Sequence, residues 1–195
     1  MADLRRMMAA AASLSRCLLE NSISHGFYGS VMTSLMGSGF NTEDVSCIVE
    51  RGPTGMHPFR RVREALEGND QLAVTNSPWT NRLFITYTQV IPPITIEILP
   101  AGEEGPRRLD SNTVTPIRGV PFLNITEFIR AKLRAWTTRG LEQDAHDLLF
   151  MLTRYWTQVD INRIPDADME RFVSQHEEAT TAWDAIKAQY ENDSP

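Results

Sequence analysis

A chain of 195 residues, 42% hydrophobic and 23% charged, has the length of one domain with a helical appendage and the composition of a globular protein. This balance excludes wholesale disorder, and no apolar run is long enough for a membrane-spanning helix. The net charge of -6 argues against general nucleic-acid binding, because attraction to phosphates needs a basic surface.

The first predicted element is an N-terminal helix that ends before His25. Its buried face would carry, at helical spacing, Leu4, Met8, Ala11, Leu14 and Leu18. The apolar run at 7–14 is short and rich in alanine, so it predicts a helix and not a secretory signal. The two cysteines, Cys17 and Cys47, match no disulfide framework or zinc spacing, so we expect reduced, buried thiols in a cytoplasmic protein.

The middle of the chain alternates strand and helix signals. After the strand end at 27–28 and a Gly29-Ser30 turn, the pattern predicts, in order, a helix over 31–36, a strand over 44–49, a helix over 58–67 and strands over 71–75, 83–88 and 94–99. The helix over 58–67 would point Arg60, Arg61 and Arg63 outward, and the charged, glycine-containing stretch 101–110 predicts an exposed loop.

From Thr126 onward the pattern is helical. Thr126 is the expected N-cap, with Glu127 in the first turn, and Gly140 ends this helix. A second helix is expected over 141–155, and a charged helical tail over 169–190. The element order predicts an α/β (α+β) fold, a mixed sheet flanked by helices, with an N-terminal helix at 1–23, a core at 24–118 and a C-terminal helical region at 119–195.

Three residues, Gly29, Ser30 and Asp44, have the types and spacing of a functional site. A small Gly29-Ser30 pair ends one predicted strand and opens a helix, where free backbone N–H groups attract anions and glycine allows a phosphate to approach. Asp44 begins the next predicted strand and could hold a divalent cation beside those phosphates. The pattern therefore indicates a site for a phosphate-bearing ligand and a metal ion.

These residues resemble the signature of the nucleotidyltransferase superfamily. The signature reads Tyr28-Gly29-Ser30, a helix, and then Asp44-Val45-Ser46, and Glu97 matches a third acid on a later strand. The segment 119–123, followed by Lys132, Arg139, Asp144 and Asp147, is similar to the helical end of small bacterial and fungal members, including antitoxin-linked ones. The resemblance covers roughly 24–152.

The resemblance implies a nucleotidyltransferase-like fold and a division of roles. Asp44 and Glu97 would be the catalytic acids and would hold Mg²⁺. The residues expected to contact the nucleotide are Gly29, Ser30, Ser46, Lys132 and Arg139. The partners would be a nucleoside triphosphate and an unidentified acceptor. For Lys132 and Arg139, seven residues apart on one helix face, a phosphate contact competes with a surface role, and Asp144 and Asp147 could pair with either across two helices.

One position departs from the family pattern. The second acid of the signature falls on Ser46, and a serine hydroxyl is a poor Mg²⁺ ligand compared with a carboxylate. Two-metal chemistry needs carboxylates that clamp both ions, so Asp44 and Glu97 alone would hold one ion. Three hypotheses stay open: an active transferase, an inactive binding protein with a degenerate site, and a fold adapted to other transferase chemistry.

Overall fold

The structure is a computed structural model that describes residues 2–39, 45–76 and 82–193. The chain divides into two compact units, Met1–Leu123 and Asn124–Pro195. The first unit contains all the described strands and three helices, and the second contains helices and short 3-10 turns. None of the described helices is long and apolar enough to cross a lipid bilayer.

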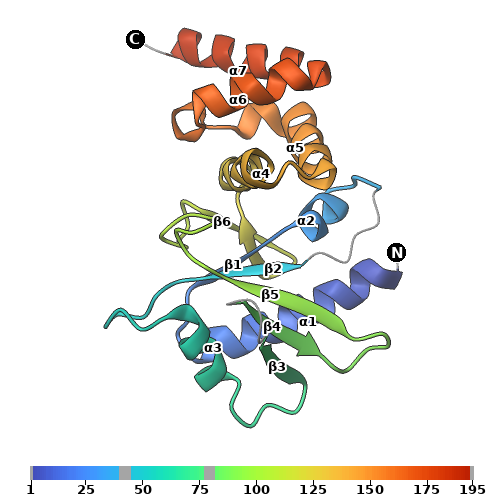
Figure 1. Cartoon of the computed structure of the whole chain (residues 1–195), viewed down its shortest axis with the longest axis vertical. Coiled ribbons are helices and arrows are strands. Elements are labelled where there is room, and N and C mark those ends of the chain that lie inside the picture. Colours follow the sequence, from blue (N-terminus) through green and yellow to red (C-terminus); the bar gives the residue numbers. More distant parts are fainter. Residues whose placement is uncertain (1, 40–44, 77–81, 194–195) are drawn as a thin grey trace. The chain divides into compact units, whose positions relative to one another are not determined.

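A seven-stranded mixed sheet forms the centre of the first unit (Figure 1). The strand order is β3-β4-β5-β2-β1-β7-β6. The strands are β1 (His25–Tyr28), β2 (Ser46–Val49), β3 (Leu72–Asn76), β4 (Leu83–Tyr87), β5 (Ile94–Pro100), β6 (Val114–Ile117) and β7 (Val120–Leu123). β2 pairs with β5 and β1 with β7 in parallel, and the other neighbours are antiparallel. The sheet is therefore mixed, as the sequence predicts.

Three helices accompany the sheet: α1 (Ala2–Glu20), α2 (Ser30–Leu35) and α3 (Pro58–Ala65). α1 packs against β1, β5 and β7, and α3 packs against β5 (Figure 1). Along α1, the predicted apolar face is confirmed, since Ala11, Leu14 and Leu18 are fully buried and Met8 is almost so. Burying this stripe on the sheet stabilises the helix more than its intrinsic propensity does.

The central strands are short and lie inside the protein. All four residues of β2 are buried, because β2 lies between two other strands and has side chains covered on both faces. In β5 the apolar residues Ile94, Ile96 and Ile98 are buried at alternate positions, which is the period of two expected for a strand. The strands predicted at 83–88 and 94–99 are thereby confirmed within a residue at each end.

The hairpin β6–β7 has no counterpart among the predicted strands. Its two-residue turn, Arg118-Gly119, has positive φ at both positions (52° and 82°), which is the conformation that suits a tight hairpin. Pro116 and Pro121 face each other in the ladder. Proline cannot donate a backbone hydrogen bond and is depleted in strands, so the sequence pattern does not predict strands here.

The second unit consists of α4 (Ile125–Arg139), α5 (Glu142–Tyr155), α6 (Asp166–Gln175) and α7 (Thr180–Asp193), with 3-10 turns at η1 (Trp156–Gln158), η2 (Ile161–Arg163) and η3 (Glu177–Ala179). Gly140 ends α4 in the left-handed conformation, as predicted. The expected N-cap at Thr126 is wrong: Asn124 caps α4 by accepting from the Glu127 N–H. The helical tail expected over 169–190 is two helices, because the chain leaves the helical conformation at His176.

Candidate functional site

The turn between β1 and α2 is built around Gly29. Its φ of 112° lies in the region that side chains with a Cβ avoid, so glycine is required for the chain to leave β1 and enter the helix directly. Ser30 is the first residue of α2 and is buried. α2 has only six residues, so its summed dipole and the attraction of that dipole for an anion are small.

Ser46 and Glu97 are direct neighbours on adjacent strands. β2 pairs in parallel with β5 so that Ser46 and Glu97 are Cα partners, and on the other side β1 places Tyr28 opposite Ser46. Side chains of paired residues project from the same face of a sheet. The turn at Gly29 follows Tyr28 directly, so the structure brings Gly29, Ser46 and Glu97 to one region of the first unit.

Glu97 already has a cationic partner. Arg82 donates from Nε to Glu97 Oε1 at 2.5 Å and from Nη2 to Oε2 at 2.6 Å, which is a bidentate pair (Arg82 precedes β4). The Arg82 guanidinium also lies 5.5 Å from the centre of the Phe84 ring. About half of the Arg82 side chain is exposed, so the pair should contribute little to stability, about 0–1 kcal/mol. A competing ligand could therefore open it.

The described part of this region does not hold enough ligands for two metal ions. It offers one carboxylate, Glu97, with both oxygens engaged by Arg82, and the buried hydroxyls of Ser30 and Ser46. Among the residues that the structure describes, no group of three or more His, Cys, Asp or Glu side chains is placed to hold a metal. The predicted acid Asp44 lies outside the described residues. The described ligands would support at most one Mg²⁺, and only with Glu97 released from Arg82.

In the second unit, Lys132 and Arg139 are engaged by two aspartates of the next helix. Lys132 Nζ lies 3.0 Å from Asp144 Oδ1 and 2.8 Å from Asp147 Oδ2, and the side chains of all three residues are almost fully buried. Arg139 Nη2 lies 3.2 Å from Asp144 Oδ2, with its own side chain 40% exposed. The expected pairing across α4 and α5 is confirmed. The nucleotide contact expected of Lys132 and Arg139 stays a prediction.

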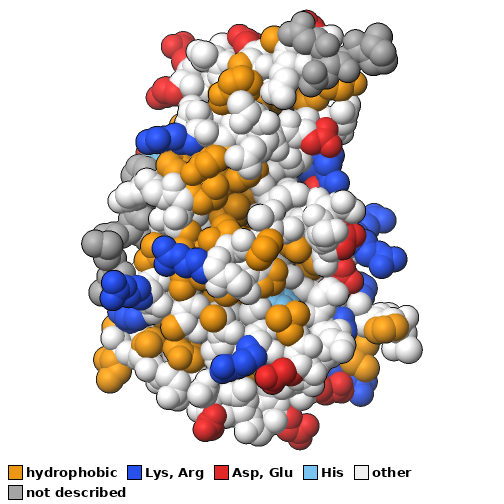
Figure 2. Space-filling view, turned by 180° about the vertical axis from the view of Figure 1, so that it is seen from behind, with side chains coloured by type: hydrophobic (Ala, Val, Ile, Leu, Met, Phe, Trp, Pro, Cys, Tyr) orange, Lys and Arg blue, Asp and Glu red, His pale blue; other side chains and the backbone are white. Residues whose placement is uncertain are grey.

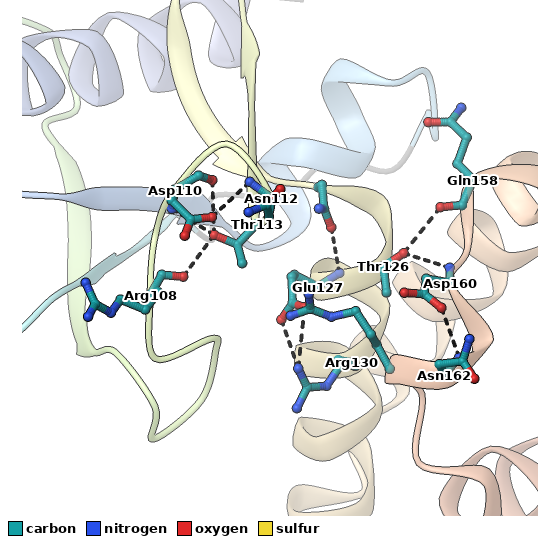
Figure 3. Close-up of polar contacts among 12 residues, drawn as sticks. Arg108, Asp110, Asn112, Thr113, Thr126, Glu127, Arg130, Gln158, Asp160 and Asn162 are labelled. Carbon is teal, nitrogen blue, oxygen red and sulfur yellow. Dashed lines mark hydrogen bonds and ion pairs between the residues drawn. The ribbon is translucent and has the colours of Figure 1, made fainter.

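A third buried acid in this unit, Glu127, has no counterpart among the predicted site residues. Glu127, 1% exposed, is bound by Arg130 from the same helix (Figure 3), and also by Arg163 of η2. Close by, Thr126 donates to the backbone O of Gln158 and accepts from the N–H of Asp160. These contacts join the start of α4 to the segment after α5, so Thr126 and Glu127 have a structural role there.

Two further titratable groups of the first unit are buried. His25 bonds through Nε2 to Ser15 Oγ and through Nδ1 to the Ile23 carbonyl, each at 2.8 Å. Burial lowers the pKa of His25, and the bond to Ile23 acts in the opposite direction. On β2, burial raises the pKa of Cys47. The imidazole is therefore neutral and the thiol protonated at neutral pH, and both are parts of the core. Cys17 is also buried and reduced, as expected.

Arg82 is the residue of this site that the sequence analysis missed. The sequence indicates its contact with Glu97 only indirectly. Arg82 precedes Phe84 by two residues, and Phe84 is the antiparallel partner of Glu97. A residue diagonally offset by two across a ladder is within reach of a long side chain. Over the wider surface, the face shown in Figure 2 has basic and acidic side chains interspersed, without a broad basic area.

Solved structures resemble this chain over most of its length, although no protein-family model and no curated protein matches the sequence. An antigenic nucleotidyltransferase-like protein from Paracoccidioides brasiliensis matches with a TM-score of 0.66 at 15% identity, covering 91% of this chain and 92% of the other. The protein JHP933 from Helicobacter pylori matches with a TM-score of 0.56 at 16% identity, covering 95% of this chain and 80% of the other. At these identities the similarity establishes the fold alone.

Proposed function

We propose, on the premise that this chain has a nucleotidyltransferase-like fold, that it binds a nucleoside triphosphate with Mg²⁺ and transfers a nucleotidyl group to an acceptor. The observation that carries the proposal is the register that sets Ser46 beside Glu97, on strands adjacent to the Gly29 turn. This arrangement supports a site in which phosphate groups and a cation meet.

Each residue of the proposed site has a distinct role. Gly29 lets the triphosphate approach the backbone, and the hydroxyls of Ser30 and Ser46 would donate to its oxygens. Asp44 and Glu97 would hold Mg²⁺, which supplies charge neutralisation and orientation of the phosphates. For Glu97 to do so, its carboxylate has to leave Arg82, whose guanidinium is then available for a phosphate oxygen.

Lys132 and Arg139 remain the proposed additional nucleotide contacts, and their surroundings differ. The Lys132 ammonium is enclosed by Asp144 and Asp147, whereas the Arg139 side chain is partly exposed. A guanidinium can keep its bond to Asp144 and still present further N–H groups to a phosphate. Of the two, Arg139 is therefore the better candidate for a direct contact.

A second candidate function is nucleotide binding without transfer. Two observations favour it: Ser46 occupies the position of the second acid, and Arg82 occupies both oxygens of Glu97. An arginine in that place neutralises the carboxylate without acting as a Lewis acid. In such a protein the bound nucleotide would serve recognition or regulation.

Two measurements on the full chain distinguish these functions. Calorimetry with nucleoside triphosphates, with and without Mg²⁺, tests binding. Transfer is tested by movement of the label from an α-labelled triphosphate to small-molecule, RNA or protein acceptors, with release of the unlabelled β- and γ-phosphates as pyrophosphate. The active protein should release pyrophosphate, and D44N and E97Q should lose that release while E64Q, an exposed carboxylate of α3, keeps it. Binding without release supports the second candidate. Absence of heat at millimolar triphosphate rejects both.

A further inference from the structure

A cavity of about 680 Å³ opens elsewhere in the first unit, beyond the ends of β2 and β5. Its walls come from the segments that follow these strands, from α3 and from the residues after α1. β2 and β5 are parallel, so both strands run toward this cavity, and Ser46 stands at the opposite end of β2. At about 3.3 Å per residue, Ser46 lies roughly 13 Å from Glu50 at the cavity rim.

Arginine dominates the charge of this cavity. Arg51, Arg61, Arg107 and Arg108 line it, together with the acids Glu50 and Glu103. In a chain with a net charge of -6, this makes a local excess of positive charge. The Glu50 carboxylate is partly engaged, because its Oε1 accepts from the Leu109 N–H at 2.5 Å.

The charges of these arginines are not neutralised within the described ranges 2–39, 45–76 and 82–193, where none of the four forms an ion pair. Arg61 donates to the backbone carbonyls of Glu50 at 2.9 Å and Ser22 at 3.1 Å, which hold its guanidinium in place but carry no charge. Figure 3 shows the Arg108 guanidinium pointing away from the turn at 110–113, where its backbone O accepts from Thr113.

Two glycines shape the backbone around the arginine side chains. A Cβ on Gly102 would lie 2.9 Å from Arg107 Cγ, and one on Gly52 would lie 3.3 Å from Arg61 Cδ. Gly102 also has a φ of +87°, which other residues avoid. The stems of Arg61 and Arg107 thus lie directly over bare backbone. This close fit places the stem of Arg61, whose guanidinium is also held by two backbone carbonyls, while the Arg107 side chain is exposed at the cavity.

We propose that this arginine pocket binds a small anion with two or more phosphate groups, at a site separate from the one that contains Ser46 and Glu97. Guanidinium groups pair with phosphate oxygens through two parallel N–H···O bonds, and several of them converging on one cavity match a multiply charged ligand. The anion relieves the mutual repulsion of the arginines. The size of the cavity suits a ligand of this kind, because small-molecule sites typically measure about 300–1,000 Å³.

Calorimetric titration with inorganic tripolyphosphate, in the absence of Mg²⁺ and of any nucleoside, tests the pocket. The double variant R51Q/R107Q should bind at least about tenfold more weakly than the unaltered chain, a change of about 1.4 kcal/mol. The matched control R5Q/R60Q removes the same charge from exposed positions on α1 and α3 and should bind as the unaltered chain does. Circular dichroism and thermal unfolding establish that each variant is folded. If R51Q/R107Q does not fold, the single variants R51Q and R108Q are tested in its place.

Four results would overturn the inference. The first is no binding of tripolyphosphate to the unaltered chain, and the second is equal weakening in both double variants, which would mean general charge attraction. The third is loss of binding in R82Q with retention in R51Q/R107Q, which would place the anion at the proposed nucleotide site. A single-stranded RNA that binds far more tightly than tripolyphosphate, with the same dependence on Arg51 and Arg107, would also reject a small anion as the occupant.

Discussion

Arg82 holds both carboxylate oxygens of Glu97, and Glu97 is the strand neighbour of Ser46. An arginine therefore occupies the oxygens through which, in the proposed function, Glu97 would bind Mg²⁺. A divalent cation has to displace Arg82 before it can bind Glu97. The pair is partly exposed and contributes little to stability, so the free-energy cost of this displacement is small.

Replacing Arg82 should tighten Mg²⁺ binding. In R82Q the Glu97 carboxylate loses its cationic partner, so a divalent ion no longer competes with a guanidinium, and the dissociation constant of Mg²⁺ should fall by up to about fivefold, the factor that ~1 kcal/mol corresponds to. Calorimetric titration with MgCl₂ measures the change. R60Q, which breaks the exposed Arg60–Glu64 pair of α3, is the control and should leave Mg²⁺ binding unchanged. Unchanged or weaker Mg²⁺ binding in R82Q would contradict the competition.

An acid at position 46 should make the stability of the chain depend on Mg²⁺. S46D adds a buried carboxylate beside Glu97, and like charges at this distance repel. Without Mg²⁺ the melting temperature should fall by about 4 °C or more, the shift expected for ~2 kcal/mol in a chain of this size. Saturating Mg²⁺ should restore it. S46N, which is similar in size and uncharged, should show no such recovery. Equal behaviour of the two variants would mean that position 46 does not face a metal site.

The Lys132 ammonium should be essential to the stability of the second unit. K132M removes the buried ammonium that lies between Asp144 and Asp147 and leaves the partly exposed Arg139 as the cation bound to Asp144, which should cost about 3–5 kcal/mol of unfolding free energy. Urea unfolding followed by circular dichroism measures the loss. K187M removes an ammonium of the same unit that pairs with Glu170 and Asp184 at the surface, and should cost only about 0.5 kcal/mol. Similar losses in the two variants would contradict a buried ion-pair cluster.

His25 should contribute a pH dependence to folding. Since burial lowers the pKa of His25 in the folded chain, the unfolded chain binds the proton more tightly. The stabilisation is complete above the ordinary histidine value of about 6.5 and is lost as the pH falls through the lower, folded-state pKa. Urea unfolding at pH 7 and pH 5 should show this loss, and H25Q should show a smaller one. H146Q should retain the loss of the unaltered chain, and an unchanged pH slope in H25Q would rule out this origin.

Local patterns in the sequence were sufficient for most of the described elements of the first unit. The helix with Leu14 and Leu18 on one face and the strands around Ile85 and Ile96 follow from apolar periodicity, which depends on near neighbours in the chain. The hairpin with Pro116 and Pro121 did not follow, because its ladder runs against the usual preference of proline. Thr126 was a plausible cap by composition, but its hydroxyl bonds to the segment at 158–160 instead.

Tertiary neighbours of the site could not be predicted in the same way. Spacing and the family resemblance were enough to predict the motif that contains Gly29, Ser46 and Glu97. The strand register brings those three positions together. The pairing of Arg82 with Glu97 requires the β4–β5 register, which spacing does not supply. Arg61, expected to point outward, instead bonds to the carbonyls of Glu50 and Ser22, since α3 lies beside the end of β2.

The position of Ser46 is held from both flanks, by β1 on one side and β5 on the other. A slip of one residue in β2 would break both ladders and turn the buried Cys47 toward Glu97. The backbone location of position 46 is thus independent of which side chain occupies it. A single-codon change there alters the chemistry of the site while the scaffold stays in place, so this fold can gain or lose an acid without rebuilding its sheet.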